Sequence, residues 1–330
     1  MKVLVIGGTR FLGHELTWRL VAEGHEVTLL NRGTLPDAFG TRVLRLRGDR
    51  TTGDFERLLA GRTFDAAVDF AAYDGTDGRR VVEVLGGRVG HYVVISTGQV
   101  YLVREGCPRP AREADYDGPV TREPAHSFDR GQWDYGVKKR ALEEALTEAW
   151  SKSRFPSTRL RIPMVSGERD HFRRLERYLW RMLDGGPLLL PDGGLHSTRH
   201  VYSGSVVKAL LALLGHSETF GQAYNLTQDE TPTLRELLTL LAETLGAPSR
   251  LVDVPAERIQ AAGLDPLLLS PFSGTWMSFL DPARARAELG FRHEPLVSYL
   301  DKIVTSFLAH PPADPPPGYE SRAAELRLAR

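Results

Sequence analysis

Short apolar runs alternate with helical patterns through the first part of the chain. The run Val3–Ile6 is continuous and ends at two glycines, which is typical of a strand buried on both faces. Residues 11–22 then carry apolar side chains at helical spacing. Further strands are expected at 26–31, 43–46, 66–70 and 92–96, with helices at 54–60 and 79–85. Alternating strands and helices predict an α/β fold with a parallel sheet and right-handed crossovers.

The pattern changes after Ser96. Residues 102–132 are rich in proline, glycine and charge, which predicts a long loop of the kind that binds ligands or covers a site. A helical pattern follows from Tyr135 to about Trp150, and a strand at 160–162 ends at Pro163. The second half is less regular. Helices are expected there at 172–183, 206–214, 234–245, 282–289 and 296–308, and short strands at 188–190, 199–202 and 223–226.

Composition and charge narrow the function classes. The 330 residues include 42 lysines plus arginines and 42 aspartates plus glutamates, so the neutral chain is not a general polyanion binder. The single cysteine makes no intrachain disulfide, and no Cys/His cluster has zinc-ligand spacing, so no metal is expected. No apolar run approaches the roughly 20 residues of a membrane span. We expect a cytoplasmic protein without a membrane partner.

A glycine-rich turn joins the first strand to the first helix. Gly7 and Gly13 allow a tight turn and a close approach of backbone to a pyrophosphate, which would face the helix N-terminus. Arg10 replaces the usual middle glycine, and its guanidinium either contacts the phosphates or points into solvent. The turn reads Gly7-Gly8-Thr9-Arg10-Phe11-Leu12-Gly13.

The end of the second strand bears on the choice of cofactor. An acidic residue there would bind the ribose 2′-hydroxyl of NAD, whereas an arginine accommodates the 2′-phosphate of NADP. This chain has Asn31-Arg32-Gly33 and no carboxylate, so NADP is favoured over NAD. Asp49, after the third strand, is expected either to touch the adenine or to hold its own turn.

These features predict a Rossmann-like, doubly wound parallel sheet with a smaller C-terminal α+β substrate lobe. The NAD(P)-binding domain is expected at 1–165, with return segments near 196–226. The substrate lobe is expected mainly at 166–310. The proline-rich tail at 311–330 begins with a stretch that is expected to be stiff and exposed, and its last residues, 320–330, are expected either to form a helix that packs elsewhere or to be frayed.

Tyr135 and Lys139 are the first candidates for catalysis. They lie four residues apart on one face of a helix. A nearby ammonium lowers the pKa of a tyrosine, which then exchanges a proton with an alcohol or carbonyl near neutral pH. Ser96 and Thr97 bring two hydroxyls to the C-terminal edge of the sheet, where ligands of open α/β sheets bind. A local hydroxyl turn is the alternative for that pair.

Together these features resemble the extended short-chain dehydrogenase/reductase family, which contains nucleotide-sugar epimerases and dehydratases. The resemblance covers roughly residues 1–310. Beyond the glycine turn and Asp49, the segments that match in order are Phe70-Ala71-Ala72-Tyr73, Ser96-Thr97 with Val100-Tyr101, Tyr135-Gly136-x-x-Lys139 with Glu143, and Arg161-x-Pro163-x-x-x-Gly167.

The resemblance implies a role for each matching residue. Tyr135 would be the acid/base, Thr97 its hydroxyl partner, and Lys139 the group that supports the tyrosine and holds the nicotinamide ribose. Pro163 to Val165 would line the nicotinamide. The implied cofactor-binding residues are Gly7, Thr9, Arg10, Phe11, Leu12, Gly13, Asn31, Arg32, Asp49, Phe70, Ala71, Ala72, Ser96, Tyr135, Lys139, Pro163 and Val165.

The variant glycine turn resembles an atypical branch of that family, which includes chloroplast stem-loop RNA-binding proteins and bacterial epimerase-like enzymes. Gly98-Gln99 stands where dehydratases carry an Asp-Glu pair, which disfavours dehydration. Arg199 is similar to the arginine that grips a sugar-nucleotide diphosphate, but it is shifted by one position. Arginines at 173, 177 and 181 form a basic helix face that either clamps an anionic substrate or is solvated. The candidate substrate residues are Gln99, Tyr101, Arg173, Arg177 and Arg199.

The leading hypothesis is an NAD(P)-dependent oxidoreductase or epimerase that acts on a hydroxyl or carbonyl of a sugar or sugar nucleotide by Tyr-Lys-Thr hydride-transfer chemistry. A ketoreductase of a secondary metabolite is one alternative. An RNA-associated, non-catalytic family member is the other, and the neutral charge and intact triad count against it. The family resemblance also implies a homodimer through the helix that bears Tyr135.

Overall fold

The computed structural model describes all 330 residues, which divide into two compact units. Unit 1 comprises Met1–Pro163, Ser203–Thr227 and Ser278–Arg292. Unit 2 comprises Met164–Tyr202, Gln228–Met277 and His293–Arg330. The first domain boundary was expected at 165, and one later segment, near 196–226, was expected to return to the NAD(P)-binding domain. The second return, at 278–292, was expected in the substrate lobe.

Unit 1 is built on a seven-stranded parallel sheet with the order β10-β6-β5-β4-β1-β2-β3. Its central strands are continuous apolar runs, and Val3, Leu4 and Val5 are fully buried. The predicted doubly wound sheet is therefore confirmed. The strands are β1 (Lys2–Ile6), β2 (Glu26–Asn31), β3 (Val43–Arg47), β4 (Ala66–Asp69), β5 (Tyr92–Thr97), β6 (Ser157–Ile162) and β10 (Ala223–Asn225).

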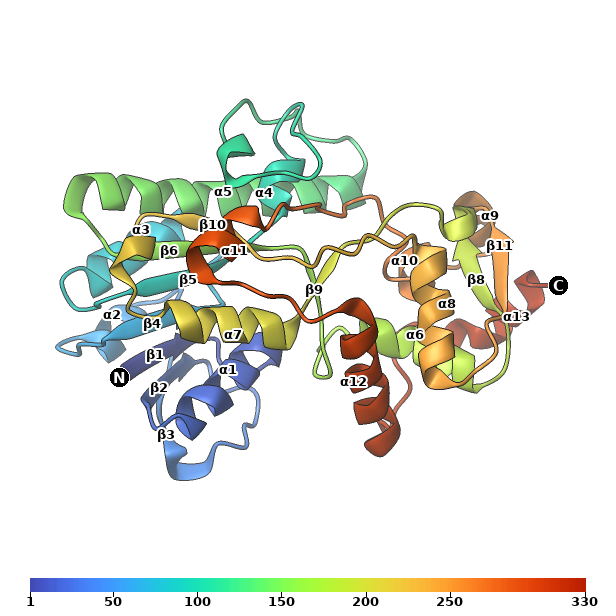
Figure 1. The fold of residues 1–330 in the computed structure, drawn as a ribbon, viewed down its shortest axis with the longest axis horizontal. Coiled ribbons are helices and arrows are strands. Elements are labelled where there is room, and N and C mark those ends of the chain that lie inside the picture. The colour runs from blue at the N-terminus through green and yellow to red at the C-terminus, as the bar shows by residue number, and fades with distance from the viewer. The chain divides into compact units, whose positions relative to one another are not determined.

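Helices cover both faces of this sheet (Figure 1). Helix α1 (Phe11–Ala22) packs against α7 (Ser203–Leu213), and α3 (Gly75–Leu85) packs against α5 (Ser127–Ser153). Helix α5 begins at Ser127, well before the predicted start at Tyr135. The sequence pattern did not reveal its first turns, because they are mostly exposed and carry no apolar repeat. The shorter helices of unit 1 are α2 (Asp54–Leu59), α4 (Gln99–Leu102) and α11 (Ala283–Leu289).

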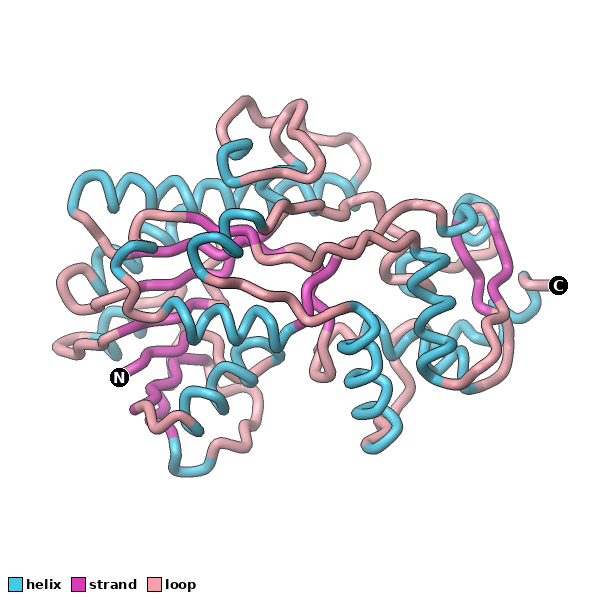
Figure 2. Tube along the Cα trace, viewed as in Figure 1, coloured by secondary structure: helices cyan, strands magenta, loops and turns pink.

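Unit 2 is an α+β lobe with two small parallel sheets (Figure 2). One pairs β7 (Met164–Ser166) with β9 (His200–Tyr202), and the other pairs β8 (Leu188–Pro191) with β11 (Leu251–Val254). The core lies between the long helices and includes Leu179, Leu238 and Tyr299. The helices are α6 (Arg174–Leu183), α8 (Leu234–Leu245), α9 (Ala256–Ala261), α10 (Pro266–Leu269), α12 (Leu296–Ala309) and α13 (Arg322–Leu328). No helix of the chain is both long enough and apolar enough to cross a bilayer.

The C-terminal tail is part of unit 2, and its last residues form the packed helix α13, one of the two alternatives expected for them. Arg181 of α6 is 1% exposed and donates to both carboxylate oxygens of Glu325 at 2.8 and 2.6 Å. Arg322 forms an ion pair with Asp184 at 2.6 Å. Arg173 donates to backbone carbonyls of the tail at 2.8 and 3.0 Å. The arginine-rich helix therefore binds the chain's own terminus, a contact that no local pattern reveals.

Candidate active site

The glycine turn after β1 is shaped by close backbone packing. Gly7 has a φ of 83°, which favours glycine. A Cβ on Gly13 would lie 2.8 Å from the carbonyl oxygen of Gly7 and from the Cα of Gly8, so no side chain fits there. The hydroxyl of Thr17 donates to the carbonyl of Gly13 at 2.7 Å and holds the first turn of α1. The turn is thus closely packed and fixed in place.

The N-terminus of α1 follows directly. Arg10 is the N-cap, is exposed, and makes no side-chain capping bond, and the N-terminus of a helix favours an anion. Phe11, the first helical residue, has a φ of 42°, a strained conformation that clusters at functional sites. The turn therefore fits the pyrophosphate of a dinucleotide.

The loop after β2 carries the residues expected to choose between NAD and NADP. The side-chain oxygen of Asn31 accepts the backbone N–H of Gly33 at 2.8 Å, so the amide serves its own turn. Arg32 is exposed. Asp49 accepts hydrogen bonds from the backbone and hydroxyl of Thr51, and these lower its pKa, with a smaller contribution from Arg32. Asp49 thus holds its own turn, one of its two expected roles, as a carboxylate.

Helix α5 places Tyr135 and Lys139 on one face. The Nζ atom of Lys139 donates to the carbonyls of Ala72 and Ile95 at 2.7 and 3.0 Å. Burial lowers the pKa of Lys139 to about 8. Burial also raises the pKa of Tyr135, and a hydrogen bond with Thr97 opposes that rise. The structure therefore brings the tyrosine and threonine together and anchors the lysine one turn further along the helix.

The other hydroxyls near β5 lie in a buried network that serves the fold. Ser96 donates to Glu143, whose carboxylate also binds Arg161 at 2.6 Å. The hydroxyl of Tyr101 donates to Asn225 at 3.0 Å and accepts from Arg161 at 2.6 Å. Ser96 and Tyr101 are each 2% exposed. This corrects their expected ligand roles, because their hydroxyls are already paired inside unit 1.

Gln99 opens α4, directly after the hydroxyl strand. Its amide nitrogen donates to the side-chain oxygen of Gln132 at 2.6 Å, and its buried Oε1 has no protein partner. Its backbone N–H donates to the Thr97 hydroxyl at 3.2 Å. The side chain is therefore a neutral amide held beside the threonine.

Three arginines expected to hold substrate make protein contacts in unit 2. The guanidinium of Arg173 binds Glu176 and the tail carbonyls. Arg177 donates to the carbonyls of Phe172, Leu267 and Leu268. Arg199 donates to the hydroxyl of Thr231 at 2.6 and 3.0 Å. The chain's own carbonyls, carboxylates and hydroxyls thus accept hydrogen bonds from these arginines, and a substrate contact for them stays a prediction.

The remaining expected residues are distributed along the edge of the sheet and the start of unit 2. Thr9 and Leu12 belong to the glycine turn and α1. Phe70, Ala71 and Ala72 form the turn after β4, which Asp69 holds by accepting the N–H groups of 71 and 72 at 2.8 Å. Pro163 is the last residue of unit 1 and is buried, whereas Val165 belongs to β7 of unit 2.

Sequence reasoning missed three side chains near the site. Arg50 forms ion pairs with the carboxylates of Asp69 and Asp77. The ring of Tyr73 lies 5.8 Å from that of Tyr135, and Gln132 holds the amide of Gln99. The available signal for Arg50 was its place in the loop after β3, three residues beyond the end of that strand. Gln132 lies in a stretch without periodicity and gave none.

Comparisons with known proteins agree with this geometry. The NAD dependent epimerase/dehydratase family matches residues 3–227. The chain is 27% identical over 261 residues to the chloroplast stem-loop binding protein of 41 kDa b from Arabidopsis thaliana. This alignment covers 75% of this chain but only 64% of that protein. It is also 27% identical over 262 residues to the 2'-dehydrokanamycin reductase of Streptomyces kanamyceticus, which covers 78% of this chain and 70% of that protein.

A solved structure shows the same fold. The UDP-glucose 4-epimerase of Thermotoga maritima, determined with UDP-glucose, superimposes with a TM-score of 0.73 at 19% identity, over 94% of this chain and 99% of that one. The family match covers more than half of the chain, and the order of the parallel sheet accords with it. The chain therefore belongs to the NAD dependent epimerase/dehydratase family and is an NAD(P)-dependent enzyme of the extended short-chain dehydrogenase/reductase type.

Proposed function

We propose that Tyr135, Thr97 and Lys139 are the catalytic residues of an oxidoreductase or epimerase that acts on a hydroxyl or carbonyl of a sugar or sugar nucleotide. The observation that carries this proposal is the position of Thr97, at the C-terminal end of β5, beside Tyr135 of α5, whose pKa it lowers. Lys139 lies one turn further along the helix and is only 5% exposed. A glycine turn fit for a dinucleotide opens at the same edge of the sheet.

Tyr135 moves the proton. In the oxidising direction its phenolate accepts the proton of the substrate hydroxyl, and in the reducing direction its phenol returns a proton to the carbonyl oxygen. Thr97 donates a hydrogen bond to the same substrate oxygen. The positive charge of Lys139 favours the phenolate. A bound nicotinamide supplies hydride transfer.

Tyr135→Phe tests this assignment. The variant keeps the ring and its packing against Tyr73 but loses the proton, so turnover falls by about 100-fold or more while cofactor binding is retained. Turnover is measured as NAD(P)H absorbance with sugar ketones and as chromatographic interconversion with a panel of UDP-sugars. Unchanged turnover on a substrate of the wild type would overturn the mechanism.

We infer that a ketoreductase, which would reduce a substrate ketone, is the second candidate function. The relative from Streptomyces kanamyceticus is named a reductase, and Gln99 offers no acid or base for eliminating water. The hydrogen bond between Gln99 and Gln132 leaves the buried amide oxygen of Gln99 without a protein partner. NADPH consumption with an aminoglycoside ketone but not with UDP-sugars would favour this direction. Interconversion of UDP-sugars without net NADPH consumption would favour the epimerase.

We also infer a preference for NADP over NAD. Arg32 follows β2 and is exposed, with no carboxylate beside it in sequence. A Cβ on Gly33 would lie 3.0 Å from the Cδ atom of Arg47, so the stem of Arg47 rests on this loop and adds a second guanidinium. Two cations on one loop suit a 2′-phosphate.

The probes for this preference are 2′,5′-ADP and 5′-AMP, measured by calorimetry. Arg32→Gln is expected to weaken 2′,5′-ADP binding by about tenfold and to leave 5′-AMP binding unchanged. Arg88→Gln removes an equal charge after α3, outside this loop, and serves as the control. An equal loss for both nucleotides in Arg32→Gln would contradict the proposed 2′-phosphate contact.

An RNA-associated role is the other candidate, because the relative from Arabidopsis thaliana is named a stem-loop binding protein. Equal counts of 42 cations and 42 anions argue against it. Fluorescence anisotropy with a labelled RNA stem-loop at 50 and 200 mM salt distinguishes the two. Tight binding that falls steeply with salt would support the RNA role.

A further inference from the structure

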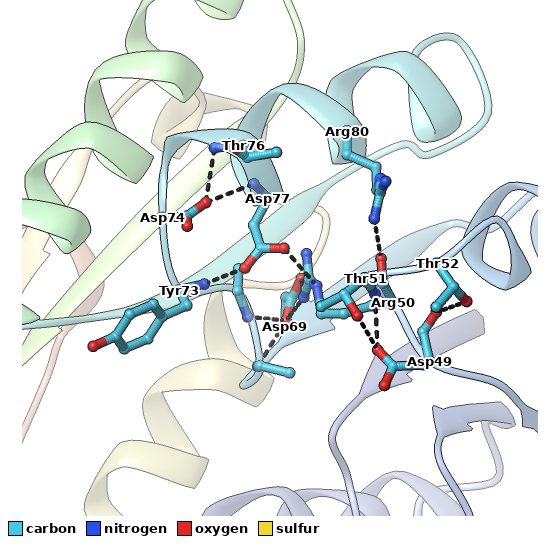
Figure 3. A network of polar contacts seen from close by, with 12 residues as sticks. Asp49, Arg50, Thr51, Thr52, Asp69, Tyr73, Asp74, Thr76, Asp77 and Arg80 are labelled. Atoms are coloured by element: carbon cyan, nitrogen blue, oxygen red, sulfur yellow. Dashed lines mark hydrogen bonds and ion pairs between the residues drawn. The ribbon is translucent and has the colours of Figure 1, made fainter.

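A buried cluster of charges lies at the ends of β3 and β4 (Figure 3). Arg50 donates from one guanidinium nitrogen to both oxygens of Asp69, at 2.9 and 2.7 Å, and from Nε to Asp77 at 3.1 Å. Arg50 is 8% exposed and Asp69 is fully buried. Phe55 lies under the guanidinium at 5.4 Å. One arginine therefore joins the end of β4 to the first turn of α3.

Both carboxylates also hold the turn between β4 and α3. Asp69 accepts the backbone N–H groups of Ala71 and Ala72, each at 2.8 Å. Asp77 accepts the N–H of Tyr73 at 2.7 Å with the oxygen that Arg50 does not use. Each carboxylate thus bonds to Arg50 on one side and to the backbone of this turn on the other.

This turn also binds the candidate catalytic lysine, because the carbonyl of Ala72 accepts a hydrogen bond from Nζ of Lys139 at 2.7 Å. We propose that Arg50 is a positioning residue for Lys139: it fixes Asp69 and Asp77, which fix the turn whose Ala72 carbonyl holds the ammonium. This inference rests on the role proposed above for Lys139.

The charges around Lys139 make the proposal measurable. The groups that face it are Asp69 of β4, Asp77 of α3, Glu143 of its own helix and Arg50. Glu143 is paired with Arg161, so the two aspartates and two cations nearly balance. The aspartates raise the pKa of Lys139, whereas Arg50 lowers it. Removing Arg50 therefore leaves two carboxylates to act on the lysine alone.

The test follows NADP⁺ binding to the purified protein by calorimetry between pH 6.5 and 9.5. In the wild type the affinity falls as Lys139 loses its proton, with a midpoint near pH 8. Arg50→Met is expected to weaken binding and to move the midpoint upward by about one pH unit. Tyr92→Phe is the matched control, because it removes an uncharged bond to Asp69 of 2.8 Å. It is expected to lower stability without moving the midpoint.

An unmoved midpoint in Arg50→Met would overturn the proposal and leave Arg50 a purely structural residue. If that variant does not fold, Arg50→Lys keeps the charge but lacks the planar fork that reaches both aspartates. Weaker NADP⁺ binding by Arg50→Lys, with an unmoved midpoint, would then support the proposal that Arg50 positions Lys139. An unchanged affinity for NADP⁺ in this variant would overturn that proposal. Lys139→Met separates the two hypotheses: a pH dependence as in the wild type would show that the role proposed for Lys139 itself has failed.

Discussion

Lys139 is a buried cation, so its presence at the site reduces the stability of the fold. Its pKa is lowered to about 8 from an ordinary 10.5, mainly by burial. Between these pH values the unfolded chain holds a proton that the folded chain has released, so stability rises with pH through that window. Below pH 8 the penalty of the buried charge is fully present. Such a cost is expected of a residue retained for chemistry.

We therefore expect Lys139→Met to raise the free energy of unfolding by about 2 kcal/mol at pH 7, although cofactor binding is weakened. The gain should shrink toward pH 10, because the wild-type lysine is then neutral. Urea unfolding at pH 7 and pH 9.5 measures both. Lys138→Met is the control, since Lys138 is an exposed partner of Asp134 and its loss should have little effect. A Lys139→Met variant less stable than the wild type at pH 7 would refute this account.

At the scale of single elements, the start of α1 depends on the absence of a side chain at residue 13. A Cβ at Gly13 meets backbone atoms of Gly7 and Gly8 at 2.8 Å, so neither neighbour can move aside easily. Gly13→Ala should push α1 away from β1, destabilise the protein by about 1–3 kcal/mol and weaken NADP⁺ binding. Gly53→Ala is the matched control, because nothing lies within 4 Å of its Cβ position. Thermal unfolding and calorimetry with NADP⁺ compare the two, and equal effects would refute the packing argument.

Helix α13 offers a second test at this scale, through the buried pair of Arg181 and Glu325. Glu325 is 1% exposed, so Glu325→Gln leaves the guanidinium of Arg181 without its counter-charge. We expect a loss of about 3 kcal/mol in the free energy of unfolding, because an uncompensated buried charge remains. Replacing Arg181 and Glu325 together by methionine should recover most of that loss. Urea unfolding measures both variants, and a double variant no more stable than Glu325→Gln would contradict the expected compensation.

At the scale of the whole molecule, features that depend on residues close together in the sequence could be predicted, whereas features that depend on distant residues could not. The strands β1 to β5 could be predicted because each is a continuous apolar run, and Tyr135 with Lys139 because one helical turn joins them. The role of Tyr101 could not, because Asn225, its partner in the buried network, lies 124 residues away. The packed tail likewise depends on Arg181 and Glu325, 144 residues apart. Local pattern thus predicts elements and short-range sites, whereas buried polar partners require the fold.

The same reasoning applies to where the chain can be cut. A fragment of residues 1–165 contains the glycine turn and the Tyr-Lys helix but lacks β10 and α7. Helix α7 packs on α1, whose Leu16 and Leu20 are fully buried, so the cut exposes an apolar face beside the cofactor turn. We expect the fragment to be unfolded or aggregated and not to bind NADP⁺. Near-ultraviolet circular dichroism and calorimetry test this, with the full chain as the control. A 1–165 fragment that bound NADP⁺ as tightly as the full chain would show that the returning segments are dispensable to the dinucleotide site.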